Sequence, residues 1–500
     1  MSNTKRAKIN WYSKKRGITL ISLVITIVVM LILAGVAISI SVGDGSVTQH
    51  AENAVEQWNA KVDEEQLKID EALGWLPGGT PSDLPEGWDS SKVAEVYEEG
   101  TRKAPIPVGY TKSGITSEIN ATSPENTIAG GLVVYQIPEG ATVDWANNQI
   151  TLSGASTPVN LQENVNQYVW IPVDDINDMV MCKYNTKTTK IDGTATDGED
   201  GICELEYDVE TNEIICKTHG FDTTGYDTTE KVLAKTNIDT TGLAGRLYGT
   251  NSSTTDTAAP KIYTTSMDFT TTSQTFSANS GYREPAIVTG SSGTSYDGAE
   301  SNLTGIGDGT VATFKAQLNK DFIAMAKSVA KYGGFYISRF EPSYENSKVI
   351  SKKNKAVLTA ATSSSGNYIA GDKWYGLYNK TLNNVEKDAS VNSHMIWGCQ
   401  YDQVIKFLGA EAQTGHNYQT KSQVVTGYTD DQDILNNVYD LEGNNYEWTA
   451  QAFSTDDRVY RGSNYNGASN SYFYPASNRH NNIPTVTSSY YATRPTLYVK

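Results

Sequence analysis

The longest apolar stretch of the chain lies near its N-terminus. Residues 18–41 carry no charged side chain, whereas residues 1–17 hold six Lys and Arg residues and neither Asp nor Glu. As a helix the uncharged stretch would be about 36 Å long, which exceeds the roughly 30 Å hydrocarbon core of a bilayer. A positively charged flank stays on the cytoplasmic side of a membrane. The pattern therefore predicts one transmembrane helix, with the rest of the chain outside the cell.

An amphipathic pattern follows this stretch. From Val55 to Leu76, apolar residues recur at mostly three-to-four-residue spacing with Glu and Lys between them, which is typical of a helix with one buried face. The sequence Pro-Gly-Gly-Thr-Pro at 77–81 ends that pattern. We therefore divide the chain into a basic leader (1–17), a hydrophobic helix with its amphipathic extension (18–76), a linker with a small β-rich segment (77–164) and an ectodomain (165–500).

The ectodomain alternates short apolar runs with polar stretches. The runs at 167–173 and 333–341 predict strands, whereas residues 316–331 and 401–408 have the 3.6-residue periodicity of helices. A Thr/Ser/Gly-rich insertion at about 185–315 predicts long loops with low burial. Short helices, irregular strands and long loops predict an α+β fold class, preceded by the long N-terminal hydrophobic helix.

Composition adds a constraint on the ligand. The formal net charge of −17 argues against nucleic-acid binding through a broad basic surface. Thirty Tyr against ten Phe favours exposed binding surfaces, because a Tyr ring has an apolar face and a hydroxyl that stays in contact with water. We therefore expect a ligand other than nucleic acid.

The junction of the basic and apolar segments, Lys-Arg-Gly-Ile-Thr-Leu-Ile at 15–21, resembles the type IV prepilin cleavage signal. The resemblance implies that a prepilin peptidase cleaves between Gly17 and Ile18 and methylates the new N-terminus, and that other pilin subunits are partners. Ser22 stands where the family usually has Glu, so a minor subunit, or a protein that does not assemble, fits better than a major pilin. A Sec signal peptide and a plain signal anchor are the alternatives.

Four ordered segments resemble the formylglycine-generating enzyme family, a variant of the C-type lectin-like fold. They are Tyr-Val-Trp-Ile-Pro-Val at 168–173, Leu-Glu-Gly-Asn-Asn-Tyr-Glu-Trp-Thr at 441–449, Arg-Val-Tyr-Arg-Gly-Ser-Asn-Tyr at 458–465 and Ala-Thr-Arg-Pro-Thr-Leu-Tyr-Val at 492–499. The resemblance covers roughly residues 165–500 and implies a lectin-like ectodomain. The segments at 441–449 and 458–465 match the core motifs of that family.

The chemistry of that family does not carry over to this chain. Its enzymes use two cysteines soon after the segment matched by 458–465, and the corresponding positions here are Gly467 and Tyr472. Without a thiolate at either position the oxidase reaction lacks its nucleophile and metal ligand. We therefore expect a protein that is not an enzyme.

The same resemblance suggests one metal site. Asn444 and Glu447 match family positions that give oxygen ligands to Ca²⁺, which prefers such ligands. Calcium is therefore a candidate cofactor. The alternative is that Asn444 caps a turn and Glu447 pairs with an arginine such as Arg461.

Three of the four cysteines cluster in one region of the sequence. Cys203 and Cys216 flank two short strand-like runs around a polar turn, which predicts a disulfide across a hairpin if the domain is extracellular. Half-buried thiols are the alternative. Cys399 stands apart and is predicted to be a small buried residue beside a helix.

The segment 461–493 has the composition of a binding surface. Six Asn, six Ser and five Tyr make up 17 of its 33 residues, and it contains no Lys, Asp, Glu, Gln, Met or Trp. Tyr with Asn and small residues is typical of antibody-like surfaces, and so many amides would need dedicated partners in a core. A polar low-complexity loop is the alternative. The residues expected to be exposed and to bind ligand are Tyr465, Asn466, Asn470, Tyr472, Tyr474, Asn478, His480, Asn481, Asn482, Tyr490 and Tyr491.

The same segment resembles the variable region of proteins that retroelements diversify. Taken together, these features predict a minor pilin-like or membrane-anchored adhesin, single-pass, with an extracellular C-terminal domain that binds an unknown surface protein or glycan. A structural pseudopilin of a secretion or DNA-uptake machine is the alternative. A formylglycine-generating-type oxidase ranks third.

Overall fold

The computed structural model describes residues 84–115, 124–185, 200–210, 213–217, 231–232, 243–245, 247–248, 262–263, 284–288, 290, 296–409, 412, 423–427, 433–465 and 475–500. For most strand residues between 181 and 263 it describes the backbone alone. All of these residues belong to one of the two units into which the chain divides, Pro81–Lys500. The leader at 1–17 and the segment at 18–76 lie outside the described residues.

Strands dominate the described part of the chain. It contains twenty-eight strands and four α-helices, and none of those helices is long and apolar. The fold is therefore sheet-rich, and the predicted α+β class with a long N-terminal helix is wrong. One reason is that the Thr/Ser/Gly-rich insertion, predicted as loops, contains strands from β10 to β15. These strands include Ile, Val and Tyr, which fit a pleated strand well.

The predicted single-pass membrane location is also contradicted. Among the residues that the structure describes, no helix has both the length and the apolar character that crossing a bilayer requires. The longest of them, α5 (Val311–Tyr332), carries five Lys and Asp residues along its length.

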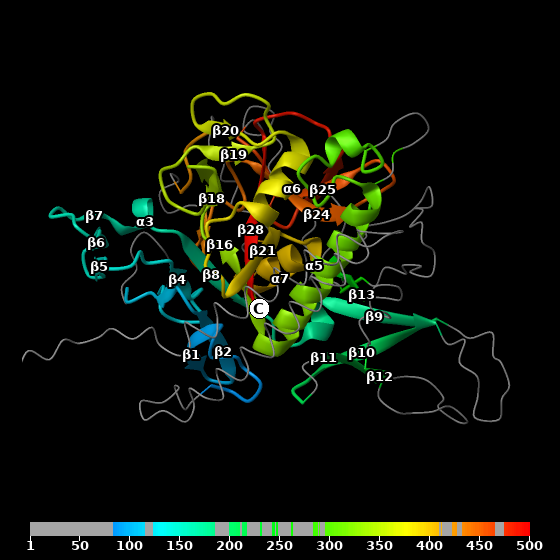
Figure 1. Cartoon of the computed structure of the whole chain (residues 1–500), viewed down its shortest axis with the longest axis horizontal. Helices are drawn as coiled ribbons and strands as arrows, with labels where there is room; N and C mark the ends of the chain where they lie inside the picture. The colour runs from blue at the N-terminus through cyan, green and yellow to red at the C-terminus, as the bar shows by residue number, and fades with distance from the viewer. Residues whose placement is uncertain are drawn as a thin grey trace, which may run out of the picture. The chain divides into compact units, whose positions relative to one another are not determined.

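An antiparallel sheet of six strands forms the centre of the described unit (Figure 1). Its strand order is β21-β28-β16-β8-β4-β3, so the strand latest in the sequence lies between two earlier ones. The strands are β3 (Thr111–Lys112), β4 (Val133–Tyr135), β8 (Gln167–Pro172), β16 (Gly334–Ser338), β21 (Val391–Met395) and β28 (Pro495–Val499).

The middle strands β8 and β16 are buried along their whole length. Trp170 lies opposite Tyr336, with ring centroids 4.9 Å apart, and Ile171 lies opposite Phe335. A strand with apolar contacts on both faces has a nearly continuous apolar sequence. This explains why the runs at 167–173 and 333–341 were recognisable as strands.

Helix α5 packs against β16 and β28. The Thr310 side chain accepts a hydrogen bond from the Thr313 amide at its start, and Gly333, with φ of 75°, ends it in the left-handed conformation. Its buried face includes Phe322, Met325 and Val329, as the periodicity predicts.

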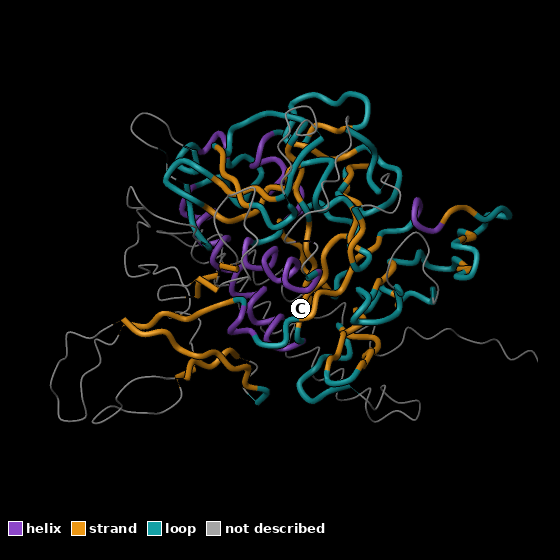
Figure 2. The backbone as a smooth tube through the Cα atoms, turned by 180° about the vertical axis from the view of Figure 1, so that it is seen from behind, coloured by secondary structure: helices purple, strands orange, loops and turns teal. Residues whose placement is uncertain are grey.

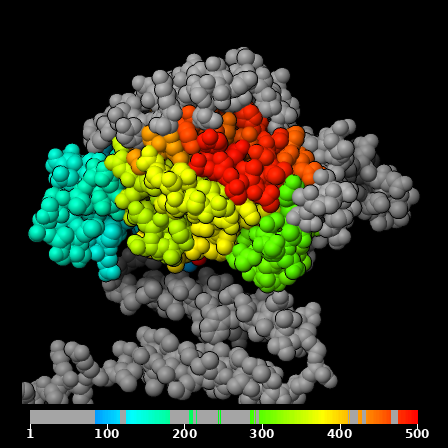
Figure 3. Space-filling view, turned by 90° about the horizontal axis from the view of Figure 1, so that it is seen from above, coloured from blue at the N-terminus to red at the C-terminus, as the bar shows by residue number. Residues whose placement is uncertain are grey.

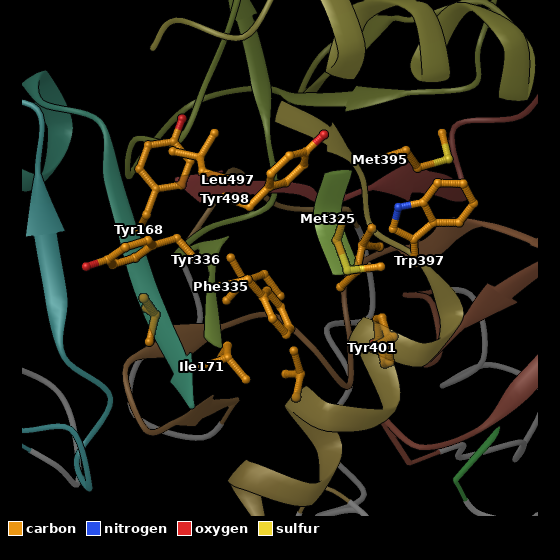
Figure 4. Close-up of a cluster of buried hydrophobic side chains, with 14 of the residues drawn as sticks. Tyr168, Ile171, Met325, Phe335, Tyr336, Met395, Trp397, Tyr401, Leu497 and Tyr498 are labelled. Carbon is orange, nitrogen blue, oxygen red and sulfur yellow. The ribbon is translucent and has the colours of Figure 1, made fainter. Parts of the chain in front are cut away.

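Two shorter helices complete the core. Helix α6 (Lys373–Asn383) contacts β21, and α7 (Gly398–Leu408) contacts β8. Figure 2 shows the helices beside the strands that they cover. In Figure 4, side chains from α5, α7 and the central strands form one cluster, with Phe335 and Met325 near its middle. Burial of these apolar groups is the main favourable contribution to folding.

A second sheet of four strands has the order β26-β25-β24-β27. It consists of β24 (Tyr446–Ala452), β25 (Arg458–Arg461), β26 (Arg479–Asn482) and β27 (Tyr491–Thr493). The pairs β24–β25 and β25–β26 are antiparallel, whereas β24 and β27 are parallel. The sequence segments 441–449 and 458–465 therefore meet as neighbouring strands of this sheet.

The remaining described elements form a five-stranded sheet with the order β12-β11-β10-β9-β13, several sheets of two or three strands, and short helices. The elements before residue 200 are β1 (Val93–Glu99), β2 (Arg102–Pro107), β5 (Thr142–Asp144), β6 (Gln149–Thr151), β7 (Val159–Asn160), α3 (Leu161–Asn164), η1 (Ile176–Asp178) and β9 (Val180–Asn185). The later ones are β10 (Asp200–Asp208), β11 (Glu213–Lys217), β12 (Lys231–Val232), β13 (Leu243–Gly245), β14 (Leu247–Tyr248), β15 (Ile262–Tyr263), η2 (Glu300–Asn302), β17 (Ser343–Glu345), β18 (Lys348–Ile350), β19 (Val357–Thr359), β20 (Tyr368–Ala370), β22 (Ile434–Leu435) and β23 (Val438–Tyr439).

Candidate functional site

One face of the four-stranded sheet carries five aromatic rings, which we call the aromatic face: Tyr446, Trp448, Tyr460, His480 and Tyr491. Strand register brings them together, because Trp448 lies opposite Tyr460, Tyr460 opposite His480, and Tyr446 opposite Tyr491. Residues directly opposite each other in a sheet point to the same side. All four strands therefore contribute to one aromatic surface.

The rings of the aromatic face are in contact with one another. The centroid of Tyr460 lies 4.7 Å from that of Tyr446 and 5.3 Å from that of His480. Tyr491 lies 5.6 Å from Tyr446 in a stacked arrangement and 5.1 Å from Trp448. Such pairs are worth about 0.5–1.5 kcal/mol each beyond the burial of their area.

Exposure changes along this face. Trp448 is completely buried and Tyr460 and Tyr491 are each 9% exposed, whereas Tyr446 and His480 are half-buried. Figure 3 shows the last part of the chain, in red, forming a continuous area of the surface in that view. The aromatic face thus runs from the core towards the surface.

Polar side chains border the rings. The Asn482 amide donates to the Tyr491 hydroxyl at 3.1 Å, and the Asn478 amide pairs with Nε2 of His480. The rings of Tyr465 and Tyr490, which belong to the same segment 461–493, contact each other edge to face with their centroids 5.2 Å apart. Amides, hydroxyls and ring faces are the groups with which proteins recognise neutral polar ligands.

His480 does not bring a charge to this face at neutral pH. Burial, and to a smaller extent the positive charge of Arg461, lower the pKa of His480 to about 4. The imidazole is therefore neutral over the physiological range. The face then offers ring surface and hydrogen bonds rather than an ionic contact.

The opposite face of the sheet is held by buried ion pairs. Arg461 and Arg479 both donate to Oδ1 of Asp402 in α7, at 2.8 and 2.6 Å. Nε of Arg494 donates to Oε1 of Glu447 at 2.8 Å. All five side chains are at most 1% exposed. Charged hydrogen bonds with fixed geometry make a rigid support for the strands that carry the rings.

The structure describes seven of the eleven predicted ligand-binding residues. None of them is fully exposed: Asn478 and Tyr491 are buried and the others half-buried. The chain returns to the sheet as β26 and β27, so these amides and rings have cross-strand neighbours. The half-buried ones are Tyr465, His480, Asn481, Asn482 and Tyr490. The other four, Asn466, Asn470, Tyr472 and Tyr474, lie outside the described residues, as does Gly467.

Sequence reasoning missed three residues of the aromatic face. Tyr446, Trp448 and Tyr460 lie before the segment that composition singled out. Their signal was the two-residue spacing of Tyr446 and Trp448, which places both side chains on one side of a strand. That spacing indicates a shared face but not which other strands complete it.

The predicted calcium ligands Asn444 and Glu447 are buried among protein partners. Oδ1 of Asn444 accepts the Val424 amide at 3.0 Å, and its Nδ2 donates to Glu341. Glu447 is paired with an arginine, as in the alternative interpretation, but the partner is Arg494 rather than Arg461. Among the described residues no group of three or more His, Cys, Asp or Glu side chains is arranged to hold a metal. Calcium stays a prediction.

Sequence reasoning did not select Glu341, a buried acid that accepts a hydrogen bond from the Asn444 side chain. Burial, with the charges of Asp440 and Glu447, raises its pKa well above the ordinary value. Oε1 of Glu341 and Oε2 of Glu447 have no hydrogen-bond partner among the described atoms. Burial beside other carboxyl groups therefore favours the neutral form of Glu341.

Cys399 is buried at the start of α7, as predicted. The Glu284 carboxyl group accepts the amides of Gly398 and Cys399, at 2.7 and 2.5 Å. Burial, with the charge of Glu284, raises the pKa of the Cys399 thiol well above its usual value. A thiol in this state is a poor nucleophile.

For the predicted disulfide, the structure describes the backbone but not the side chains of Cys203 and Cys216. The register places Cys216 opposite Leu205 and Cys203 opposite Cys182. The predicted processing residues Gly17 and Ile18 lie outside the described residues.

Comparison with known proteins leaves the chain without an assigned family: no protein-family model matches it, and a search of curated proteins finds no match.

Proposed function

We propose that this chain is a non-catalytic ligand-binding protein. Its binding site is the outer part of the aromatic face, with the side chains of Asn478 and Asn482 beside it. The ligand is a neutral glycan or a neutral patch on a surface protein. The proposal keeps the predicted adhesin-like activity and makes no claim about a membrane anchor.

One observation carries the proposal. Rings from four strands meet on one face whose outer members, Tyr446 and His480, are partly exposed. The segment 461–493, which includes His480 and Tyr491, contains no Lys, Asp or Glu, and its Arg461 and Arg479 are buried against Asp402. A rigid aromatic surface without charge favours ligands that stack on rings and exchange hydrogen bonds.

Two further observations support a non-catalytic role. Gly467 and Tyr472 stand where the resembled enzymes have cysteines. The one cysteine whose side chain the structure describes, Cys399, is buried with a raised pKa. Neither feature suits thiolate chemistry.

The test is a glycan array and a protein-ligand screen with the purified full chain, followed by affinity measurements on the best binder. Tyr446→Ala and His480→Ala remove the two half-buried rings at the outer edge of the face. We expect each to weaken binding at least about tenfold, since a ring at a contact centre contributes about 1.4 kcal/mol or more.

The matched control is Tyr97→Ala, which removes a half-buried tyrosine on β1, outside the four-stranded sheet. We expect it to bind as the unmodified chain does. Equal losses in all three variants, or no loss in the two face variants, would refute this location of the site.

A further inference from the structure

Three cysteines lie on neighbouring strands of a five-stranded sheet with the order β12-β11-β10-β9-β13. Cys182 is on β9, Cys203 on β10 and Cys216 on β11. The antiparallel register makes Cys182 and Cys203 direct partners. Cys216 has Leu205 as its partner, two residues further along β10 than Cys203.

These register positions decide which pair can be linked. Direct partners in an antiparallel pair have Cα atoms about 4.5 or 5.5 Å apart. Both values fall within the range of about 4.4–6.8 Å that a disulfide spans. Residues related as Cys203 and Cys216 are diagonal neighbours about 7–8 Å apart, beyond the roughly 7 Å that a disulfide bridges without backbone movement.

The register at this point is anchored by Asn177. Its side chain accepts the Leu205 amide at 2.7 Å and donates to the Leu205 carbonyl at 2.9 Å. A slip of one residue would move every side chain of β10 to the other face and would break both hydrogen bonds. The two hydrogen bonds at Leu205 therefore help to hold Cys203 in register with Cys182.

The register places Cys182 and Cys203 on one face of the sheet together with two leucines. Leu243 of β13 is the direct partner of Cys182 on its other side, and Leu205 follows Cys203 by two residues. Residues with these relations share a face, and both leucines are only 3% exposed.

We propose that Cys182 and Cys203 form a disulfide between β9 and β10, while Cys216 and Cys399 remain thiols. The co-reactant is a small-molecule disulfide such as oxidised glutathione. One cysteine thiolate attacks its sulfur and releases one glutathione thiol. The second cysteine thiolate then attacks the mixed disulfide and releases the other, so two electrons and two protons leave on the two glutathione molecules.

The test is peptide mapping of the purified full chain after equilibration with oxidised and reduced glutathione. Free thiols are alkylated in denaturant without reductant before digestion. Trypsin alone would leave Cys203 and Cys216 in one peptide, because no Lys or Arg lies between Lys190 and Lys217. Cleavage after glutamate separates them, since four Glu residues lie between the two cysteines.

We expect a peptide that contains Cys182 linked to one that contains Cys203, with Cys216 and Cys399 alkylated. In Cys216→Ser the same link should form, whereas in Cys182→Ser we expect alkylated Cys203. A link between Cys203 and Cys216, or alkylation of all four cysteines in the oxidised sample, would overturn the proposal. The mapping of the unmodified chain decides the matter even if a variant fails to fold.

Discussion

The six-stranded central sheet and the four-stranded sheet bury some of their titratable groups in different ways. Beside the central sheet, Asp321 of α5 lies 3.6 Å from Nε2 of His394 on β21. Burial raises the pKa of Asp321 to about 7 and lowers the pKa of His394 to about 4. Between these values both groups are neutral. Beneath the four-stranded sheet, by contrast, Arg461 and Arg479 are buried as cations against Asp402.

The difference follows from the basic residue in each place. A buried imidazole can lose its proton, so the His394 site avoids the cost of burying charge. A guanidinium cannot, so Arg461 and Arg479 need a carboxylate within hydrogen-bond reach. The aromatic face is thus supported from behind by charges that must stay paired, whereas the His394 and Asp321 pair beside the central sheet is buried without charge.

The largest expected effect comes from removing the shared carboxylate. Asp402→Ala leaves two buried guanidinium groups without their main partner, and we expect a loss of about 3–5 kcal/mol in the free energy of unfolding. Urea denaturation measures it. The exposed pair Arg102 and Asp174 is the control: Asp174→Ala should cost at most about 1 kcal/mol. Equal costs would mean that the buried ion pairs do not hold the sheet.

The next effect concerns pH and the neutral pair. Folded Asp321 keeps its proton up to about pH 7, whereas the unfolded chain releases it near pH 4. In this window the folded state binds more protons at this group, so its contribution to stability falls as pH rises. Asp321→Asn removes that term. We expect the stability of the variant relative to the unmodified chain to increase by a few kcal/mol between about pH 4 and pH 7. A constant difference across that range would show that Asp321 is ionised in the fold.

The proposed disulfide predicts a smaller effect that depends on redox conditions. Without the link the unfolded chain gains conformational freedom, and Cys182→Ser should lose about 3 kcal/mol in an oxidising buffer. In a reducing buffer the variant and the unmodified chain should differ by much less. Cys216→Ser serves as the matched control and should not respond to the redox buffer.

The smallest effect concerns the border of the aromatic face. Asn482→Ala removes the hydrogen bond to the Tyr491 hydroxyl, and we expect a loss of about 0.5–1.5 kcal/mol in stability. Asn383→Ala removes an exposed amide contact on α6 and is the control. A larger loss in the control would mean that the Asn482 contact does not support the face.

Local patterns predicted much of the fold. The apolar runs at 167–173 and 333–341 became β8 and β16, and the periodic stretch at 316–331 lies within α5. These segments carry their signal in neighbouring residues. The fold class was wrong because the composition of the insertion was taken to indicate loops, although its short runs with Ile, Val and Tyr form strands.

The candidate site was less predictable because its parts are brought together by pairing between distant strands. The composition of 461–493 indicated the Asn and Tyr residues, but not that β26 and β27 would bury some of them against Tyr446 and Tyr460. Asp402 gave no signal at all, since it lies on α7, far in sequence from both of its arginines.

The position of β28 also constrains synthesis. Its neighbours β16 and β21 precede it by many residues, yet neither can complete its hydrogen bonds until β28 arrives between them. During translation, the edges of β16 and β21 that pair with β28 therefore stay unpaired until residues 495–499 leave the ribosome. A nascent chain with such a gap exposes unpaired strand edges, so its cell must shield the gap or complete translation quickly.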